Sequence, residues 1–235
     1  MYNCNSGLLS LRTPQGKIIE NKKIGFRGLE FVVLNPDLLV FSTGGLLTKD
    51  VRSNEFALSY IRLDGSFMAY GLPFKKKYHN INYTSPNRFS KNGEDVYFIN
   101  KFETKIYQVK ANGVDLKITL DFGSGQLKDS IMSQIRDLEN YNFFPYVIDL
   151  KIRFVNSNYL FCSYLFQGKE GFILLDHEYK VLSQGTGSII SSRTNYLDYT
   201  PYCMVENTLI GIDYINILNN RKPVLVFYDL FKTPN

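Results

Sequence analysis

A hairpin that recurs at a nearly constant spacing constrains the fold of this chain more than any other feature. Each copy has one strand of alternating character, a tight polar turn and a second strand. Three of the turns contain a glycine, at Gly16, Gly65 and Gly113, and these glycines are 49 and 48 residues apart. Asp-Gly and Asn-Gly favour hairpins because two-residue turns need positive φ angles, which glycine and asparagine tolerate. The four copies span residues 8–24, 58–72, 105–122 and 171–183.

Two further strand-like segments precede each of the last three hairpins, so the repeating unit has four strands. These segments are 31–34 with 38–42, 88–90 with 95–99, and 146–155 with 159–165. A further set, 202–205, 208–213 and 224–230, follows the fourth hairpin. A four-stranded unit that recurs about every 40–50 residues is typical of a β-propeller blade. One blade cannot bury both of its faces, so neighbouring blades must stack around an axis.

The repeats therefore predict an all-β fold, an incomplete β-propeller of four-stranded antiparallel blades in a single domain over residues 1–235. They amount to half a blade, three full blades and three strands of another, which is four to five blades. An irregular β-sandwich with the same hairpins is the alternative topology.

The spacing between the third and fourth hairpins is longer, at 64 residues from Gly113 to His177. Segment 126–140 accounts for the excess and predicts an inserted helix, because its apolar residues recur at spacings of four, four and three. Those residues are Leu127, Ile131, Ile135 and Leu138. We expect this apolar stripe to pack on the rim or a face of the propeller.

Composition and charge exclude several classes of protein. With 44% hydrophobic residues, 17 Tyr and 18 Phe, the chain has the composition of a folded, sheet-rich domain. The net charge is +5 and the one dense basic run, 75–77, is interpreted as a solvated loop, so we expect no nucleic-acid partner. Cys4, Cys162 and Cys203 supply no disulfide framework, and Cys162 and Cys203 are expected to be core residues. Residues 1–7 have neither the basic nor the apolar region of a signal peptide, so we expect none, and we expect no transmembrane segment because no apolar run is long enough.

Six short segments resemble a known family. They are Tyr-Ile-Arg-Leu-Asp-Gly at 60–65, Leu-Pro-Phe at 72–74, Asp-Val-Tyr-Phe at 95–98, Lys-Ile-Tyr-Gln-Val at 105–109, Leu-Asp-Phe-Gly at 120–123 and Pro-Val-Leu-Val-Phe-Tyr at 223–228. Together they resemble a bacterial family of six-bladed, NHL-like β-propellers of unknown function, over most of the chain from Leu8 onward. The resemblance implies a six-bladed fold and, commonly, export to the periplasm or cell envelope, often as a lipoprotein.

The chain departs from that family at its N-terminus. About a blade and a half of the six-bladed pattern is missing there, and Cys4 has no lipid-attachment context. We therefore expect an N-terminally truncated propeller. Unpaired blade edges recruit other strands, so self-association through these edges is also expected.

The sequence contains none of the standard catalytic patterns. It has two histidines and no Gly-x-Ser-x-Gly motif, and the glycine-rich segments 123–125 and 185–187 lack the residues of a phosphate-binding loop. We assign no catalytic residue, metal ligand or resident cofactor.

Carboxylates near strand ends leave one alternative open. They are Asp64, Asp95, Asp121, Glu170, Asp176 and Asp213. A central divalent cation of the Ca²⁺ type, held by such oxygens, would make the protein a metal-dependent hydrolase or lyase. Asp64 and Asp176 lie in outer turns, however, where aspartate is favoured in any case.

Loop length predicts where a ligand binds. Long connections near 73–87, 123–144 and 184–201 join successive repeats, and in a propeller these connections emerge on one face. They are rich in tyrosine and basic residues, which suit binding surfaces. The candidate ligand-binding residues are Lys76, Tyr78, His79, Tyr83, Arg88, Tyr141, Arg193, Tyr196, Tyr199 and Tyr202. We expect a non-catalytic binding or scaffold protein for a protein, peptide or glycan, while the alternative role of these aromatics is to cover the sheet ends.

Overall fold

A computed structural model describes most of the chain. The described residues are 2–3, 7–24, 26, 28, 30–42, 55–73, 88–100, 102–132, 143, 145–186, 200–205, 208–217 and 220–229. From residue 200 onward, and at residues 2, 3 and 186, only the backbone is described. Among the described residues, no helix has the length and apolar character needed to cross a membrane.

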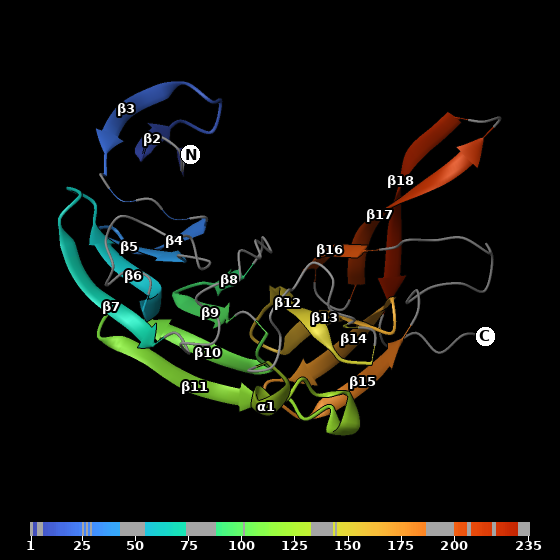
Figure 1. The fold of residues 1–235 in the computed structure, drawn as a ribbon. Coiled ribbons are helices and arrows are strands. Elements are labelled where there is room, and N and C mark those ends of the chain that lie inside the picture. Colours follow the sequence, from blue (N-terminus) through green and yellow to red (C-terminus); the bar gives the residue numbers. More distant parts are fainter. Residues whose placement is uncertain are drawn as a thin grey trace. The chain divides into compact units, whose positions relative to one another are not determined.

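The described strands form five antiparallel sheets, and in each sheet the strands follow one another in chain order (Figure 1). The first sheet has three strands, β1 (Tyr2–Asn3), β2 (Leu8–Arg12) and β3 (Ile18–Lys23). The second has four, β4 (Glu30–Asn35), β5 (Leu38–Ser42), β6 (Phe56–Arg62) and β7 (Phe67–Pro73). The third also has four, β8 (Phe89–Asn92), β9 (Asp95–Ile99), β10 (Lys105–Lys110) and β11 (Gly113–Thr119).

The two remaining sheets follow the same order. The fourth sheet contains β12 (Ile148–Val155), β13 (Tyr159–Phe166), β14 (Lys169–Asp176) and β15 (Val181–Thr186). The fifth contains β16 (Thr200–Val205), β17 (Thr208–Ile217) and β18 (Asn220–Asp229). The predicted hairpins and four-stranded units are therefore confirmed.

The residue contacts divide the chain into two compact units. One unit comprises residues 1–121 and 127–141 and contains the first three sheets, whereas the other comprises 122–126 and 142–235 and contains the last two. The single domain over 1–235 stays a prediction.

Burial follows strand position within each sheet. All five residues of β5 are buried, as are four of the five in β9 and five of the eight in β13. The last strands are largely exposed, as β3 and β11 illustrate. A second strand that is buried along its whole length has both faces covered, which is what a blade stacked between neighbours requires.

Neighbouring sheets of the first unit pack through their inner strands. Leu9 of β2 and Ile24, which directly follows β3, form one apolar cluster with Leu39, Phe41 and Ile61 of the second sheet. The turn at Gly65 lies against the first sheet as well, because a Cβ atom built on this glycine would be 3.3 Å from the Ile24 carbonyl oxygen. These contacts bury the apolar side chains that β2, β5 and β6 direct toward one another.

The inserted helix begins later in the chain than the sequence predicts. The structure has a 3-10 helix at Gly123–Gly125 and an α-helix, α1, at Asp129–Met132, while residues 133–142 lie outside the described part. The predicted start at 126 is wrong because Gln126 forms a parallel β-bridge with Val147. Of the predicted stripe, Leu127 is buried and Ile131 is half-buried, and Ile135 and Leu138 are not described.

Two further elements differ from the sequence prediction. Tyr2 and Asn3 pair with Leu9 and Leu8, so the first sheet has a third strand where half a blade was expected. The strands β17 and β18 pair continuously from Thr208–Asp229 to Ile217–Asn220, so both are longer than the predicted segments 208–213 and 224–230.

Candidate functional site

The order of the strands gives every four-stranded sheet two different ends. At one end, which we call the turn end, lie the connections between the first and second strands and between the third and fourth. At the opposite end, the loop end, lie the connection between the second and third strands and the connections to the neighbouring sheets. The connections 43–55, 74–88 and 187–199 all leave from loop ends, whereas the turn-end connections 36–37, 63–66 and 93–94 are short. The candidate site is therefore the loop end.

Most of the predicted binding residues belong to connections outside the described residues. These are Lys76, Tyr78, His79, Tyr83, Tyr141, Arg193, Tyr196 and Tyr199. For Tyr202 the structure describes only its backbone, within β16. Their role in binding stays a prediction.

Arg88 is the one predicted residue whose side chain is described. It is only 6% exposed and directly precedes β8. Its backbone N–H donates to a carboxylate oxygen of Glu30, at 3.0 Å, and its carbonyl oxygen accepts from the Ile99 N–H. Arg88 thus anchors the point where the connection 74–87 enters the third sheet.

The same contacts join the first strands of two sheets. Glu30 is the first residue of β4, so its bond to Arg88 links β4 to the start of β8 at the loop end. Further along these strands, the Lys91 Nζ donates to the Val33 carbonyl oxygen at 2.7 Å. Adjacent first strands are expected in a propeller, where they surround the central channel.

Polar side chains also hold the connection between β9 and β10. The Tyr107 hydroxyl of β10 donates to a Glu103 carboxylate oxygen at 2.7 Å, and the Glu103 N–H donates to the Asn100 carbonyl oxygen. The Leu120 N–H donates to the carbonyl oxygen of Thr104 at 2.8 Å. Asn100 and Thr104 are buried, so this part of the loop end has a fixed base.

In the second unit, a row of charged residues begins near the loop end and continues along β12: Asp149, Lys151 and Arg153, which we call the charge row. Lys151 Nζ lies 2.6 Å from an Asp149 oxygen, and these side chains are 17% and 12% exposed. Arg153 Nε donates to Ser163 Oγ at 2.6 Å, and Arg153 Nη2 lies 2.8 Å from Glu170 Oε1. Each charge of the row thus has a partner of opposite sign within the same sheet.

The backbone of β12 is irregular around the charge row. Its pairing with β13 shifts between Ile148 and Lys151 and again between Ile152 and Phe154, and Asp149 has a φ of 56°. Bulges of this kind change the direction in which side chains point. Sequence reasoning missed this row, although the alternation of charged and apolar residues from Asp149 to Phe154 was visible.

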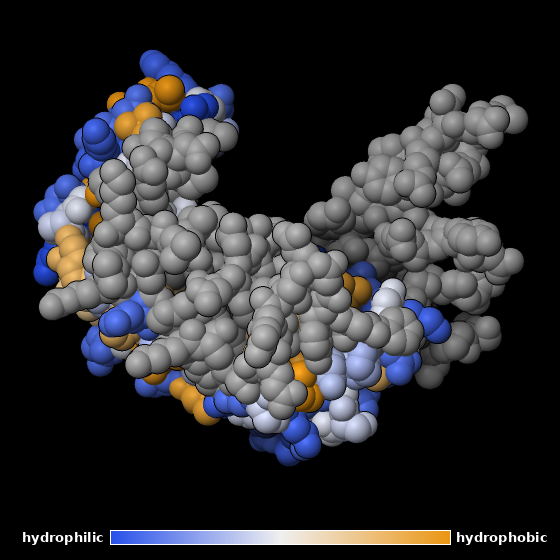
Figure 2. Space-filling model, viewed as in Figure 1, coloured by the Kyte–Doolittle hydropathy of each residue, from blue (hydrophilic) through white to orange (hydrophobic). Residues whose placement is uncertain are grey.

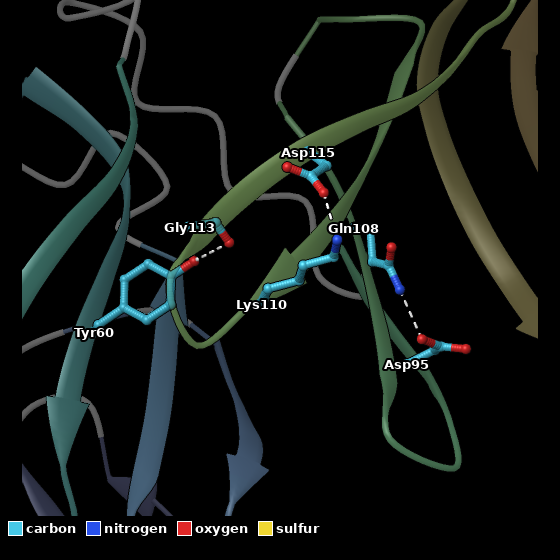
Figure 3. Close-up of polar contacts among 6 residues, drawn as sticks. All are labelled: Tyr60, Asp95, Gln108, Lys110, Gly113 and Asp115. Carbon is cyan, nitrogen blue, oxygen red and sulfur yellow. Dashed lines mark hydrogen bonds and ion pairs between the residues drawn. The ribbon is translucent and has the colours of Figure 1, made fainter.

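Several of the candidate metal-binding carboxylates have other roles in the structure. Both Asp64 and Asp176 accept hydrogen bonds from backbone N–H groups of their own turns, and the Ser66 side chain and N–H lower the pKa of Asp64. Gln108 Nε2 donates to Asp95 at 2.6 Å (Figure 3). Within the described residues, no three His, Cys, Asp or Glu side chains are placed to share a metal ion.

Cys162 is a core residue, as predicted. It is fully buried in β13, and burial raises the pKa of its thiol. A thiol held in its neutral form away from solvent is not a reactive nucleophile.

Comparison with known proteins agrees with this architecture. A family model described as a six-bladed β-propeller matches residues 9–212. The chain belongs to this family of six-bladed β-propellers. The comparison with curated proteins found no match.

A solved structure supports the fold of this propeller chain. It is the crystal structure, at 2.60 Å resolution, of a protein from Bacteroides fragilis NCTC 9343 that is named "Putative exported protein". The TM-score is 0.65 at 13% sequence identity, and the match covers 90% of this chain and 61% of that one. The chain thus spans less than two thirds of the solved protein, and at this identity the likeness shows the fold alone.

Proposed function

We propose that this propeller is a non-catalytic binding or scaffold protein that holds a protein, peptide or glycan ligand at its loop ends. The observation that carries the proposal is the asymmetry of the sheets. Short turns close one end, whereas the connections 43–55, 74–88 and 187–199 leave from the other. Long connections on a rigid scaffold are where binding residues concentrate.

The described base of the loop ends supports this role. Buried or half-buried contacts, such as Arg88 with Glu30 and Glu103 with Tyr107, fix the points where connections enter the sheets. A binding surface needs such support, because residues on an unsupported segment lose more conformational entropy when a ligand binds.

The residue types of the connections support a binding role as well. Tyr78, Tyr83, Tyr196 and Tyr199 combine a large contact area with a hydroxyl group, and Lys76 and Arg193 add positive charge. Tyrosine and arginine are enriched in binding sites, and flat aromatic rings also stack on sugars.

The proposal is tested by screening the purified protein against glycan and peptide arrays and then measuring affinity for each hit. Replacement of Tyr196 and Tyr199 by alanine is expected to weaken binding at least about tenfold, as loss of aromatic contact residues does at binding sites. His177→Ala is the control, because His177 is exposed in a turn-end connection of the fourth sheet. Binding that survives in the tyrosine double variant would contradict this placement of the site.

We also propose that the protein acts in the periplasm or cell envelope. The support is the family resemblance together with the name of the solved relative, which describes an exported protein. Antibody detection in periplasmic, membrane and cytoplasmic fractions of the organism that makes the protein tests this. Recovery in the cytoplasmic fraction alone would contradict it.

A further inference from the structure

Exposed large hydrophobic side chains gather on the outer hairpins, which are formed by the last two strands of each sheet. The described part of the chain has ten such residues, and eight of them lie on these hairpins. They are Leu11, Ile18, Ile19, Phe67, Met68, Leu116, Val181 and Leu182. The outer hairpins therefore carry most of the exposed apolar surface among the described residues.

The local backbone argues against one explanation for this exposure, the addition of a strand from another chain. Register shifts in three outer hairpins leave Ile19, Met68 and Leu182 as extra residues, each at the second position of its strand. A bulge bends and twists an edge strand and so disfavours further pairing along it. The exposed apolar residues need a partner of another kind.

The β2–β3 hairpin combines the most exposed apolar residues with the most positive charge. Leu11, Ile18 and Ile19 are 51%, 47% and 62% exposed. The same hairpin carries the basic residues Arg12, Lys17, Lys22 and Lys23 against one acidic residue, Glu20, which pairs with Lys22. In Figure 2, orange apolar surface lies among blue hydrophilic surface at the position of β2 and β3 in Figure 1.

We propose that the β2–β3 hairpin binds an anionic lipid surface. Ile18 and Ile19 enter the boundary between headgroups and acyl chains, while Lys17 and Lys23 remain among the headgroups. Aliphatic residues with basic neighbours bind membranes in this way, because apolar burial and attraction to anionic lipids act together. Lysine suits this position, since its stem lies along apolar surface while its ammonium group stays hydrated.

The composition of the hairpin favours a lipid surface over a protein partner. Protein interfaces are enriched in aromatic residues, methionine and arginine and depleted in lysine. The segment 8–23 has no aromatic residue and three lysines. A second copy of the chain is disfavoured as well, because two identical hairpins would bring their excess positive charge together.

The fourth sheet supplies a matched comparison within the same chain. Val181 and Leu182 of β15 are 52% and 47% exposed, and Leu182 lies at the equivalent bulge. The hairpin β14–β15 and its turn carry three acidic residues, Glu170, Asp176 and Glu178, against Lys169 and Lys180. This hairpin has similar apolar exposure without the positive charge, so we expect it to bind anionic lipid poorly.

Co-sedimentation with vesicles tests the proposal. The protein is expected to pellet with vesicles of equal parts phosphatidylglycerol and phosphatidylcholine but not with phosphatidylcholine alone. The double variant Ile18→Ser/Ile19→Ser is expected to lower the partition coefficient about tenfold through lost apolar burial. Lys17→Glu/Lys23→Glu is expected to lower it by a similar factor, through lost attraction to the headgroups. Added salt should weaken binding of the unchanged protein.

Val181→Ser/Leu182→Ser is the control and is expected to leave vesicle binding unchanged. The substituted side chains are all exposed, and a circular dichroism melt verifies that each variant is folded. Equal binding to both kinds of vesicle, or an equal loss in the control, would overturn the proposal. Absence of vesicle binding would overturn it too. This holds even if the hairpin were found to bind an acidic protein.

Discussion

Two sheets, one in each compact unit, place a tyrosine ring over a glycine of the neighbouring strand. In the second sheet, a Cβ atom built on Gly71 would lie 2.7 Å from the ring of Tyr60. In the fourth sheet, a Cβ atom on Gly171 would lie 2.3 Å from the ring of Tyr164. Because glycine has no side chain, each tyrosine ring passes over its glycine. The tyrosine hydroxyl then donates a hydrogen bond to a carbonyl oxygen of a more distant residue.

The two tyrosines differ in the strand that they reach. The Tyr60 hydroxyl donates to the Gly113 carbonyl oxygen of the third sheet at 3.0 Å (Figure 3), whereas Tyr164 donates to Gly185 within its own sheet at 3.4 Å. Val114 lies beside the same contact, 3.3 Å from a Cβ atom on Gly71. One arrangement thus joins two blades and the other braces a single blade.

The first strands of these sheets differ as well. The strand β4 has one charged residue, Glu30, whereas β12 carries the charge row of Asp149, Lys151 and Arg153. The same four-stranded pattern therefore tolerates charges inside the sheet when each has a partner of opposite sign.

Replacement of the glycines is expected to have the largest effect. Gly171→Ala should lower the free energy of unfolding by about 1–3 kcal/mol, because the Tyr164 ring is buried and must move. Gly71→Ala should cost less, since its closest ring contact is longer. Urea unfolding measures both, and Gly185→Ala, with a contact of 3.1 Å to Phe172, is the milder control. Equal stability of all three variants would show that the tyrosine rings do not exclude a side chain.

Loss of one charge in the charge row should have the next largest effect. Asp149→Asn keeps a residue that tolerates the positive φ but leaves Lys151 without its carboxylate partner. We expect a loss of about 1–3 kcal/mol, because both side chains are mostly buried. Asp115→Asn, which breaks an exposed pair with Lys110, is the matched control and should leave unfolding unchanged. Equal effects at the two sites would mean that burial of the row contributes nothing.

Removal of the two hydroxyl groups tests the difference between the tyrosines. Tyr60→Phe should cost about 1 kcal/mol, and Tyr164→Phe less, because its hydrogen bond is longer. The reverse order, measured by denaturant unfolding, would contradict the assignment of Tyr60 as the stronger link.

The pH dependence of stability gives a second measure of the Tyr60 contact. Burial raises the pKa of Tyr60 from 10.0 to about 12, so the folded state favours the neutral phenol. The stabilisation is fully present below pH 10 and is lost as pH rises towards 12. Tyr60→Phe should therefore flatten the fall in melting temperature over this range, and an unchanged slope would show that other groups cause it.

The smallest expected effect is that of a chelator. The turn aspartates of both sheets, Asp64 and Asp176, accept backbone hydrogen bonds. We expect EDTA to leave the melting temperature unchanged, as measured by differential scanning fluorimetry. A chelator-dependent decrease, or metal found by elemental analysis, would favour the alternative of a metal-dependent hydrolase or lyase.

The sequence predicts the sheets well because their signals are local. Turn glycines such as Gly65 and alternating strands such as 105–110 contain the information within a few residues. The contact between Tyr60 and Gly113 joins residues 53 apart, so no local pattern reveals it. Helix periodicity at Leu127 and Ile131 was also misleading, because pairing of Gln126 with Val147 delays the start of the helix. For the site, sequence reasoning indicated the loop ends but placed Arg88 on the binding surface, whereas its side chain is buried.

The central claim, that ligands bind at the loop ends, is tested most directly by hydrogen–deuterium exchange. The measurement compares the free protein with the protein bound to a peptide or glycan from the array screen. We predict slower exchange in the connections 43–55, 74–88 and 187–199. Slower exchange confined to the turn-end connections 63–66, 111–112 and 177–180 would contradict the account.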